Sequence, residues 1–131
     1  MARKRLYLDI ETSPNIGMFW EAGFKKTIDY SNIIHERSII CICYKWEGKK
    51  EVHALMWDKK QSDKKMLSDF MKVAVEADEL VGHNIKKFDM PWVRTRCLLY
   101  GIKVPHDLNI LDTLTIAKTK FRFNSNRLNY I

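Results

Sequence analysis

The chain has 131 residues, of which 46% are hydrophobic and 30% charged, and this composition is typical of one soluble globular domain. No stretch reaches the roughly 18 apolar residues of a membrane helix, and the basic start lacks the apolar run of a signal peptide, so we expect a cytoplasmic protein. The three cysteines form no Cys-x-x-Cys pair, which argues against a zinc site.

The first half of the chain is predicted to supply a strand, a long flap and a hairpin. A short apolar run ends at the breakers Thr12-Ser13-Pro14, as a strand does, and consists of Leu6, Tyr7, Leu8 and Ile10. Residues 15–34 have no clean period, so we expect a flap beside the end of that strand. Residues 38–46 and 51–57 are rich in β-branched and aromatic side chains, and the short turn between them predicts a hairpin.

The second half alternates helices with short strands. Ser62 is the expected cap of a helix whose apolar stripe is Met66, Leu67, Phe70, Val73 and Ala74. The elements predicted after it are a strand over 79–84, a helix from Asp89 to Gly101, a short strand over 109–111 and a helix from 112 to 118. A last helix is expected to begin near Ser125. This order predicts an α/β fold with a mixed sheet and flanking helices.

Asp9 and Glu11 are the first candidate site residues. They stand at i and i+2 near the carboxyl end of a strand, so both side chains project from one face. Two adjacent carboxylates repel each other, and a hard cation such as Mg²⁺ or Mn²⁺ would relieve the repulsion. The alternative is a strand whose last polar residues are simply in water.

Asp89 is the second candidate acid. It follows a strand that we expect to run parallel to the first, so the two strand ends would bring it toward Asp9 and Glu11. Three converging carboxylates would suit a pair of metal ions about 4 Å apart. The alternative is a helix N-cap, because a carboxylate there accepts hydrogen bonds from free backbone N–H groups.

These residues carry a specific resemblance. Leu8-Asp9-Ile10-Glu11-Thr12 and His83-Asn84-x-x-x-Phe88-Asp89 resemble the first two motifs of the DEDD-type 3′→5′ exonucleases, and Ile110–Leu114 resembles the segment after them. That family has a ribonuclease H-like fold. The sequence is most similar to the exonuclease domains of family B DNA polymerases and to stand-alone phage-type relatives, and a viral source would imply the host cytoplasm.

The resemblance implies a two-metal Mg²⁺ or Mn²⁺ site held by Asp9, Glu11 and Asp89, which would also be the catalytic residues. It implies single-stranded or frayed 3′ DNA ends as substrate, with replication or repair machinery as partners. The residues implied to contact substrate are Thr12, Asn84, Lys86, Lys87 and Phe88, and those implied to support the site from behind are His83 and Asp112. A core position for Phe88, a solvated turn for the lysines and a helix cap for Asp112 stay open.

The third motif of the family, a Tyr or His followed four residues later by Asp, has no counterpart in the sequence. We therefore expect residues 1–131 to be one exonuclease-like domain that lacks its C-terminal part, and whether it is active or inactive alone stays open. Two other functions remain open. The net charge of +7 also suits a nucleic-acid-binding module with an incomplete site, or a structural partner whose acids are only caps and solvated ends.

Overall fold

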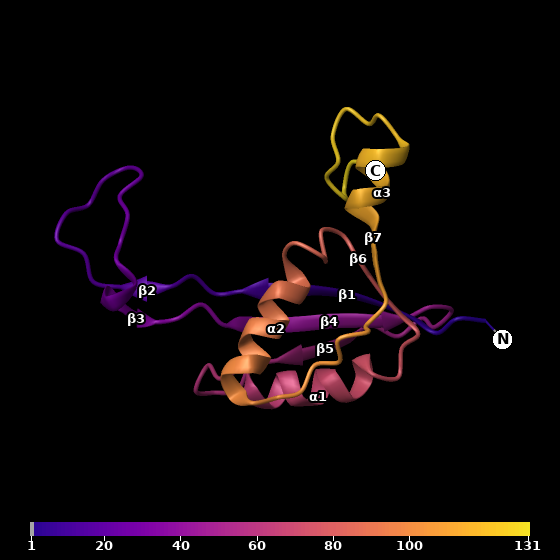
Figure 1. The fold of residues 1–131 in the computed structure, drawn as a ribbon, viewed down its shortest axis with the longest axis horizontal. Coiled ribbons are helices and arrows are strands. Elements are labelled where there is room, and N and C mark those ends of the chain that lie inside the picture. The colour runs from indigo at the N-terminus through magenta and orange to yellow at the C-terminus, as the bar shows by residue number, and fades with distance from the viewer. Residues whose placement is uncertain (1) are drawn as a thin grey trace.

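The structure, a computed structural model, describes residues 2–131. A mixed sheet lies at its centre, with helices α1 and α2 crossing one face and α3 projecting beyond the sheet edge (Figure 1). The elements are β1 (Arg5–Thr12), β2 (Ile16–Gly17), β3 (Ile33–His35), β4 (Ile39–Trp46), β5 (His53–Met56), α1 (Lys64–Ala74), β6 (Glu79–Gly82), α2 (Asp89–Tyr100), β7 (Ile110–Asp112) and α3 (Thr113–Lys120), with a 3₁₀ turn at Tyr30–Asn32.

The five strands of the main sheet lie in the order β5-β4-β1-β6-β7. β4 pairs antiparallel with both β5 and β1, while β6 pairs parallel with both β1 and β7. The predicted hairpin and the predicted parallel strands are therefore confirmed, and with them the mixed α/β sheet. None of the helices in residues 2–131 has the length and hydropathy needed to cross a membrane.

Strand β1 alternates strictly between the two faces of the sheet. Leu6, Leu8 and Ile10 are buried against α1 and α2, whereas Asp9 and Glu11 are exposed on the opposite face. This period of two is the pattern that a half-buried strand requires. The strand therefore anchors itself in the core with one set of side chains and displays both acids with the other.

A buried polar network ties α1, α2 and β4 together. The carboxylate of Asp63, with no exposed surface, accepts hydrogen bonds from Arg96 Nε at 2.9 Å and Nη2 at 3.0 Å. It also accepts from Tyr100 Oη at 2.7 Å and from the backbone N–H of Ile39 at 2.9 Å. Each oxygen of the carboxylate thus has a donor, as a buried charge needs.

The same network corrects one prediction. The N-cap residue of α1 is Asp63 and not Ser62, and its side chain makes no capping bond because it is engaged with Arg96. Ser62 Oγ accepts only a long bond from Lys64 N–H, at 3.4 Å. The expected helix after Ser125 is also wrong, since residues 128–130 form only a turn.

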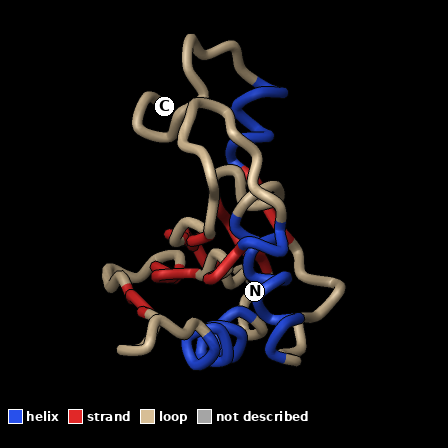
Figure 2. Tube along the Cα trace, turned by 90° about the vertical axis from the view of Figure 1, so that its left-hand side faces the viewer, coloured by secondary structure: helices blue, strands red, loops and turns tan. Residues whose placement is uncertain are grey.

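Residues 16–35, which we call the arm, project away from the sheet (Figure 1). In Figure 2, viewed from the side of the arm, α3 and the C-terminal end stand apart from the sheet at the top. At its base, Ser13 N–H donates to Ser38 O at 2.9 Å and Arg37 N–H donates to Asn15 Oδ1 at 2.6 Å. The prediction of a flap is correct in position, because the arm leaves the carboxylate end of β1. It is wrong in direction, because the arm extends outward and does not fold beside the acids.

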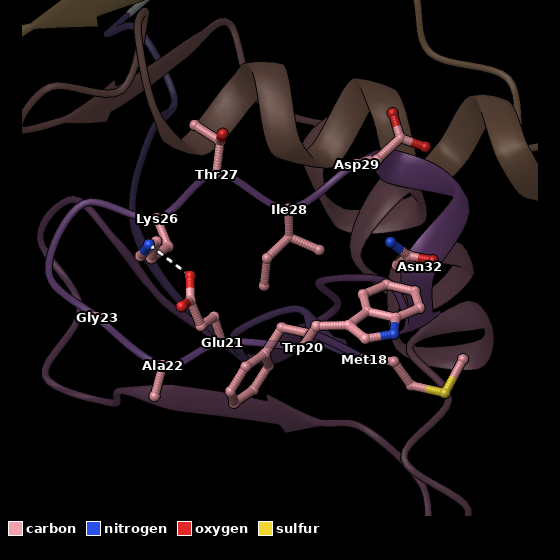
Figure 3. Close-up of a pocket in the computed structure, with 11 residues that line it drawn as sticks. Met18, Trp20, Glu21, Ala22, Gly23, Lys26, Thr27, Ile28, Asp29 and Asn32 are labelled. Carbon is pink, nitrogen blue, oxygen red and sulfur yellow. Dashed lines mark hydrogen bonds and ion pairs between the residues drawn. The ribbon is translucent and has the colours of Figure 1, made fainter.

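The arm carries large exposed side chains and a hollow of its own. Trp20, Phe24 and Tyr30 are 87%, 92% and 82% exposed. The hollow, of about 380 Å³, lies inside the arm and is bridged at one side by the Lys26–Glu21 ion pair of 3.0 Å (Figure 3). Its lining residues belong to the arm alone, so it is separate from the predicted acid site.

Candidate active site

Asp89 lies directly against the strand that carries the other two acids. Its side chain is 2% exposed, and its Oδ2 accepts a hydrogen bond of 3.2 Å from the backbone N–H of Ile10. Ile10 stands between Asp9 and Glu11 in β1. Residues 79 positions apart in the sequence are thereby joined, as the prediction of converging strand ends requires.

The alternative N-cap role of Asp89 is wrong. The N-cap of α2 is Phe88, and Asp89 is the first residue of the helix, where its charge faces the positive end of the helix dipole. The side-chain Oδ2 of Asp89 instead accepts the hydrogen bond from the backbone N–H of Ile10 in β1.

The backbone N–H of Ile10 is available because β6 stops pairing early. The parallel register of β1 and β6 ends at Tyr7 and Val81. Gly82 then passes so close that a Cβ there would lie 3.2 Å from Leu8 O and 2.9 Å from Ile85 Cβ. The absence of a side chain at Gly82 lets the loop turn beside β1, and the loop delivers Asp89 to the unpaired edge.

Asp89 is the acid of the site whose ionisation the fold opposes. Burial raises the pKa of its carboxyl group, and the negative charge of Asp9 raises it further, to about 6. Backbone hydrogen bonds, including the one from Ile10, lower that pKa in part, and the charge of Asp112 raises it slightly. Asp9 is thus close enough to Asp89 to oppose its ionisation.

Asp112 holds the loop that leads to Asp89. Its carboxylate accepts from the backbone N–H groups of Asn84 at 2.9 Å and Lys86 at 3.1 Å, and from Leu114 N–H at 2.9 Å. The last bond makes it the N-cap of α3, which confirms the predicted cap. Burial would raise the pKa of Asp112, but the backbone N–H donors outweigh burial and lower it. Asp112 therefore shapes the loop as an anion, and Asn84 adopts a left-handed φ of 64° there.

Asp112→Ala is expected to lower the free energy of unfolding by about 1–2 kcal/mol, because the cap of α3 is lost. Two more N–H groups, of Asn84 and Lys86, lose their acceptor, so the loop should loosen as well. Urea unfolding measures the first effect and amide hydrogen exchange of residues 84–89 the second. Unchanged exchange in the loop of a destabilised variant would show that Asp112 serves only α3.

The other predicted residues lie in three places. Thr12 and Phe88 flank the acids and are half-buried, and Phe88 also packs against the core. Lys86 and Lys87 are exposed on the loop. His83 faces elsewhere: its Nδ1 lies 2.9 Å from Thr113 Oγ1 and its Nε2 2.7 Å from Asn126 O, so its ring secures the C-terminal segment.

The donor set fits a hard divalent cation in type. Asp9, Glu11 and Asp89 offer only carboxylate oxygens, the ligands that Mg²⁺ and Mn²⁺ prefer. Within residues 2–131, however, no three Asp, Glu, His or Cys side chains are already arranged to hold one ion. The three acids therefore lie in one region of the fold, but their side chains do not yet converge on one point. Asp9 and Glu11 are exposed, so their side chains are free to rotate.

Arg37 and Trp92 also belong to this neighbourhood, and sequence patterns did not single them out. Arg37 Nε and Nη2 donate to Thr12 Oγ1 at 2.8 and 2.7 Å, and its guanidinium lies 4.8 Å from the ring centre of Trp92. The available signal was the position of Arg37 just before the strand that pairs with β1.

Comparison with known proteins identifies the family. The family model RNase_T, described as an exonuclease, matches residues 50–131. The chain belongs to this exonuclease family. The matched part of the exonuclease domain includes Asp89 and Asp112, and Asp9 and Glu11 lie before it. No curated protein matches the chain.

A solved structure gives independent support for the fold. The family B DNA polymerase from the hyperthermophilic archaeon Pyrobaculum calidifontis superimposes with a TM-score of 0.65 at 15% sequence identity. The match covers 91% of this chain and 16% of the polymerase chain. The predicted ribonuclease H-like fold is therefore confirmed, and the chain spans only a small part of the length of the polymerase.

Proposed function

We propose that this exonuclease-family protein removes nucleotides from the 3′ ends of single-stranded or frayed DNA by metal-dependent hydrolysis. The observation that carries the proposal is the contact of Asp89 with the backbone N–H of Ile10, between Asp9 and Glu11. The contact supports a shared site, because it joins the acid of the second motif to the backbone of β1 between the two acids of the first. Family membership supports nuclease chemistry, and the likeness to a polymerase suggests replication or repair as its setting.

The proposed metal ligands are Asp9, Glu11 and Asp89. When bound, a pair of Mg²⁺ or Mn²⁺ ions would supply an activated water and would neutralise charge on the leaving oxygen. Asp9 is the proposed ligand of both metal ions, because its charge affects the pKa of Asp89 more than the charge of any other acid does. Asp89, held by Ile10, is the fixed member of the set, while the exposed Glu11 is free to approach the terminal 3′-hydroxyl.

The proposed substrate contacts come from the loop before α2 and from the end of β1. Lys86 and Lys87 are exposed on that loop and would bind the phosphate backbone. Asn84, Phe88 and Thr12 would orient the terminal nucleotides. Stacking of a base on an aromatic ring is worth about 1–3 kcal/mol.

A second candidate function is binding of single-stranded nucleic acid without cleavage. Two observations favour it: the sequence has no Tyr or His followed four residues later by Asp, and the three acids are not preset around an ion. Under this proposal residues 1–131 bind the strand, and a further carboxylate is needed for hydrolysis.

Incubation of a 5′-labelled single-stranded oligonucleotide with Mn²⁺ tests both proposals. We expect products that shorten stepwise from the 3′ end, and Asp9→Asn should abolish them. The same substitution should weaken Mn²⁺ affinity, measured by calorimetry, at least about tenfold, because one anionic ligand is lost.

Asp107→Asn is the matched control, because Asp107 is exposed and lies outside the site. Binding without cleavage would support the second function. Equal Mn²⁺ affinity in Asp9→Asn and the parent protein would contradict the proposed metal site.

A further inference from the structure

Arg37 lies between the two halves of the acid site. Its Nε and Nη2 donate to Thr12 Oγ1 at 2.8 and 2.7 Å, and Thr12 directly follows Glu11. Its guanidinium lies 5.6 Å from the ring centre of Phe88, which directly precedes Asp89. The Arg37 side chain therefore contacts both Thr12, next to Glu11, and Phe88, next to Asp89.

The charge of Arg37 is not neutralised by the protein. The half-buried Arg5 and the buried Arg96 each pair with a carboxylate, at 2.7 Å to Glu79 and 2.9 Å to Asp63. No carboxylate in residues 2–131 lies within 4 Å of the Arg37 guanidinium, whose hydrogen-bond acceptor is the neutral Thr12 hydroxyl. A half-buried cation without an anionic partner is suited to an anion from outside.

The orientation of the guanidinium is fixed by two aromatic rings. Trp92 lies one helical turn after Phe88 on α2, and the guanidinium carbon is 4.8 Å from the Trp92 ring centre. Contact with both rings fixes the guanidinium plane and favours its positive charge. Nη1 makes no hydrogen bond within the described chain, so the N–H groups of this nitrogen are available to another acceptor.

Thr12 adds a second free donor. Its Oγ1 is the acceptor in both bonds from Arg37, so its hydroxyl proton is not used in them. Among residues 2–131 no acceptor receives that proton. Arg37 therefore orients Thr12 as a hydrogen-bond donor beside Glu11.

We propose that Arg37 and Thr12 form a phosphate-binding site that holds a phosphodiester of the substrate strand beside the carboxylates. This inference rests on the proposed function and adds the residue that offsets charge repulsion between the acids and the strand. Guanidinium and hydroxyl donors match phosphate oxygens in geometry, and Arg binds phosphate with its fork more specifically than Lys does. The stacked rings keep the fork in place before substrate arrives.

The competing role of Arg37 is purely structural. Its backbone N–H closes the base of the arm through Asn15, and its side chain joins β1 to α2. A structural latch would change stability but not the dependence of binding on salt. The two roles therefore separate in one experiment.

The test is fluorescence anisotropy of a labelled single-stranded oligonucleotide in EDTA, with NaCl varied, on the whole chain. Arg37→Met should weaken binding about tenfold and reduce the slope of log K against log [NaCl] by about 0.7, the change expected for one phosphate contact on a single strand. Arg37→Lys should leave the slope of log K against log [NaCl] unchanged, because the positive charge remains. It should still weaken binding, because lysine lacks the planar guanidinium that donates several hydrogen bonds at once. Arg94→Met removes an exposed arginine of α2; it is the matched control and should change neither quantity appreciably.

Thermal unfolding of each variant completes the test. Unchanged affinity and slope in a less stable Arg37→Met protein would overturn the phosphate site and leave a latch. An equal loss in Arg94→Met would also overturn it, because net charge alone would then explain the effect. If Arg37→Met does not fold, affinity of Arg37→Lys equal to that of the parent protein overturns the proposal. A parent protein that neither binds nor cleaves the strand would instead contradict the proposed function.

Discussion

Arg96→Met is expected to lower the free energy of unfolding by about 3–5 kcal/mol, because it leaves the buried carboxylate of Asp63 without its charged partner. Asp63 has no exposed surface, and Arg96 supplies two of the hydrogen bonds to it. Methionine has a similar length, so the loss would come from charge and hydrogen bonding more than from volume. Urea unfolding at pH 7 measures the change.

The pH dependence of the same variant gives a second measurement. In the parent protein, burial would raise the pKa of Asp63, but hydrogen bonds from Arg96, Ile39 and Tyr100 outweigh burial and lower it. A lowered carboxyl pKa contributes stability that is present above the unfolded pKa of about 3.9 and is lost as pH falls through the folded pKa. In Arg96→Met the burial of Asp63 is no longer outweighed by a charged donor, so its pKa should rise above the unfolded value. The variant should then lose stability as pH rises from about 4 to 7, a range in which Asp63 of the parent protein costs no stability.

Two controls define this prediction. Arg94→Met removes an exposed arginine from the same helix and should cost less than about 0.5 kcal/mol. Asp63→Asn combined with Arg96→Met removes both charges and should recover part of the loss. A cost for Arg96→Met as small as that of Arg94→Met would show that the pair does not stabilise the fold.

Asp89→Asn is expected to stabilise the metal-free protein by up to about 3 kcal/mol at pH 7, while removing its response to Mn²⁺. Burial and the charge of Asp9 raise the pKa of Asp89 to about 6, so its ionised form is costly in the folded state. Asparagine is nearly isosteric, and its Oδ1 can still accept the hydrogen bond from Ile10 N–H. A residue proposed to bind metal is thus a liability to the metal-free fold.

The sign of the effect depends on pH. A carboxyl pKa raised on folding contributes stability below the unfolded pKa of about 3.9, and that contribution is lost as pH rises through about 6. In EDTA, the stability advantage of Asp89→Asn over the parent protein should therefore grow between pH 4 and pH 7. With Mn²⁺ at pH 7, the parent protein should gain stability and the variant should not.

Asp107→Asn provides the surface comparison and should behave like the parent protein in both conditions. If Asp89→Asn shows the same stability difference at pH 4 and pH 7, the carboxyl group is not electrostatically strained. If Mn²⁺ stabilises the variant as much as the parent, Asp89 is not a ligand.

Local patterns were sufficient to predict most of the architecture. The period of two in β1 predicted that Asp9 and Glu11 share a face, and the turn at Gly48 predicted the β4–β5 hairpin. The proline near the start of α2 and Gly101 at its end predicted that helix within a residue. Parallel strand ends then brought Asp89 to β1. These features depend on short segments whose chemistry constrains their own conformation.

Features that depend on register between distant segments were not predictable. Opposite β1, the register shifts between Glu11 and Thr12, so that Thr12 pairs with Ile39, and this shift brings Arg37 within reach of Thr12. No sequence period encodes such an irregularity. The pairing of Asp63 with Arg96 likewise joins residues 33 positions apart and requires the packed helices.

The narrow base of the arm has a practical consequence. Ser13 N–H donates a hydrogen bond of 2.9 Å to Ser38 O. This bond holds the chain after β1 to the chain before β4, whatever the length of the arm between them. Loop entropy grows only slowly with length, at about 0.6 kcal/mol per doubling. Residues 16–35 are therefore a place where a tag, a dye attachment site or a shortened turn can be inserted without disturbing the main sheet.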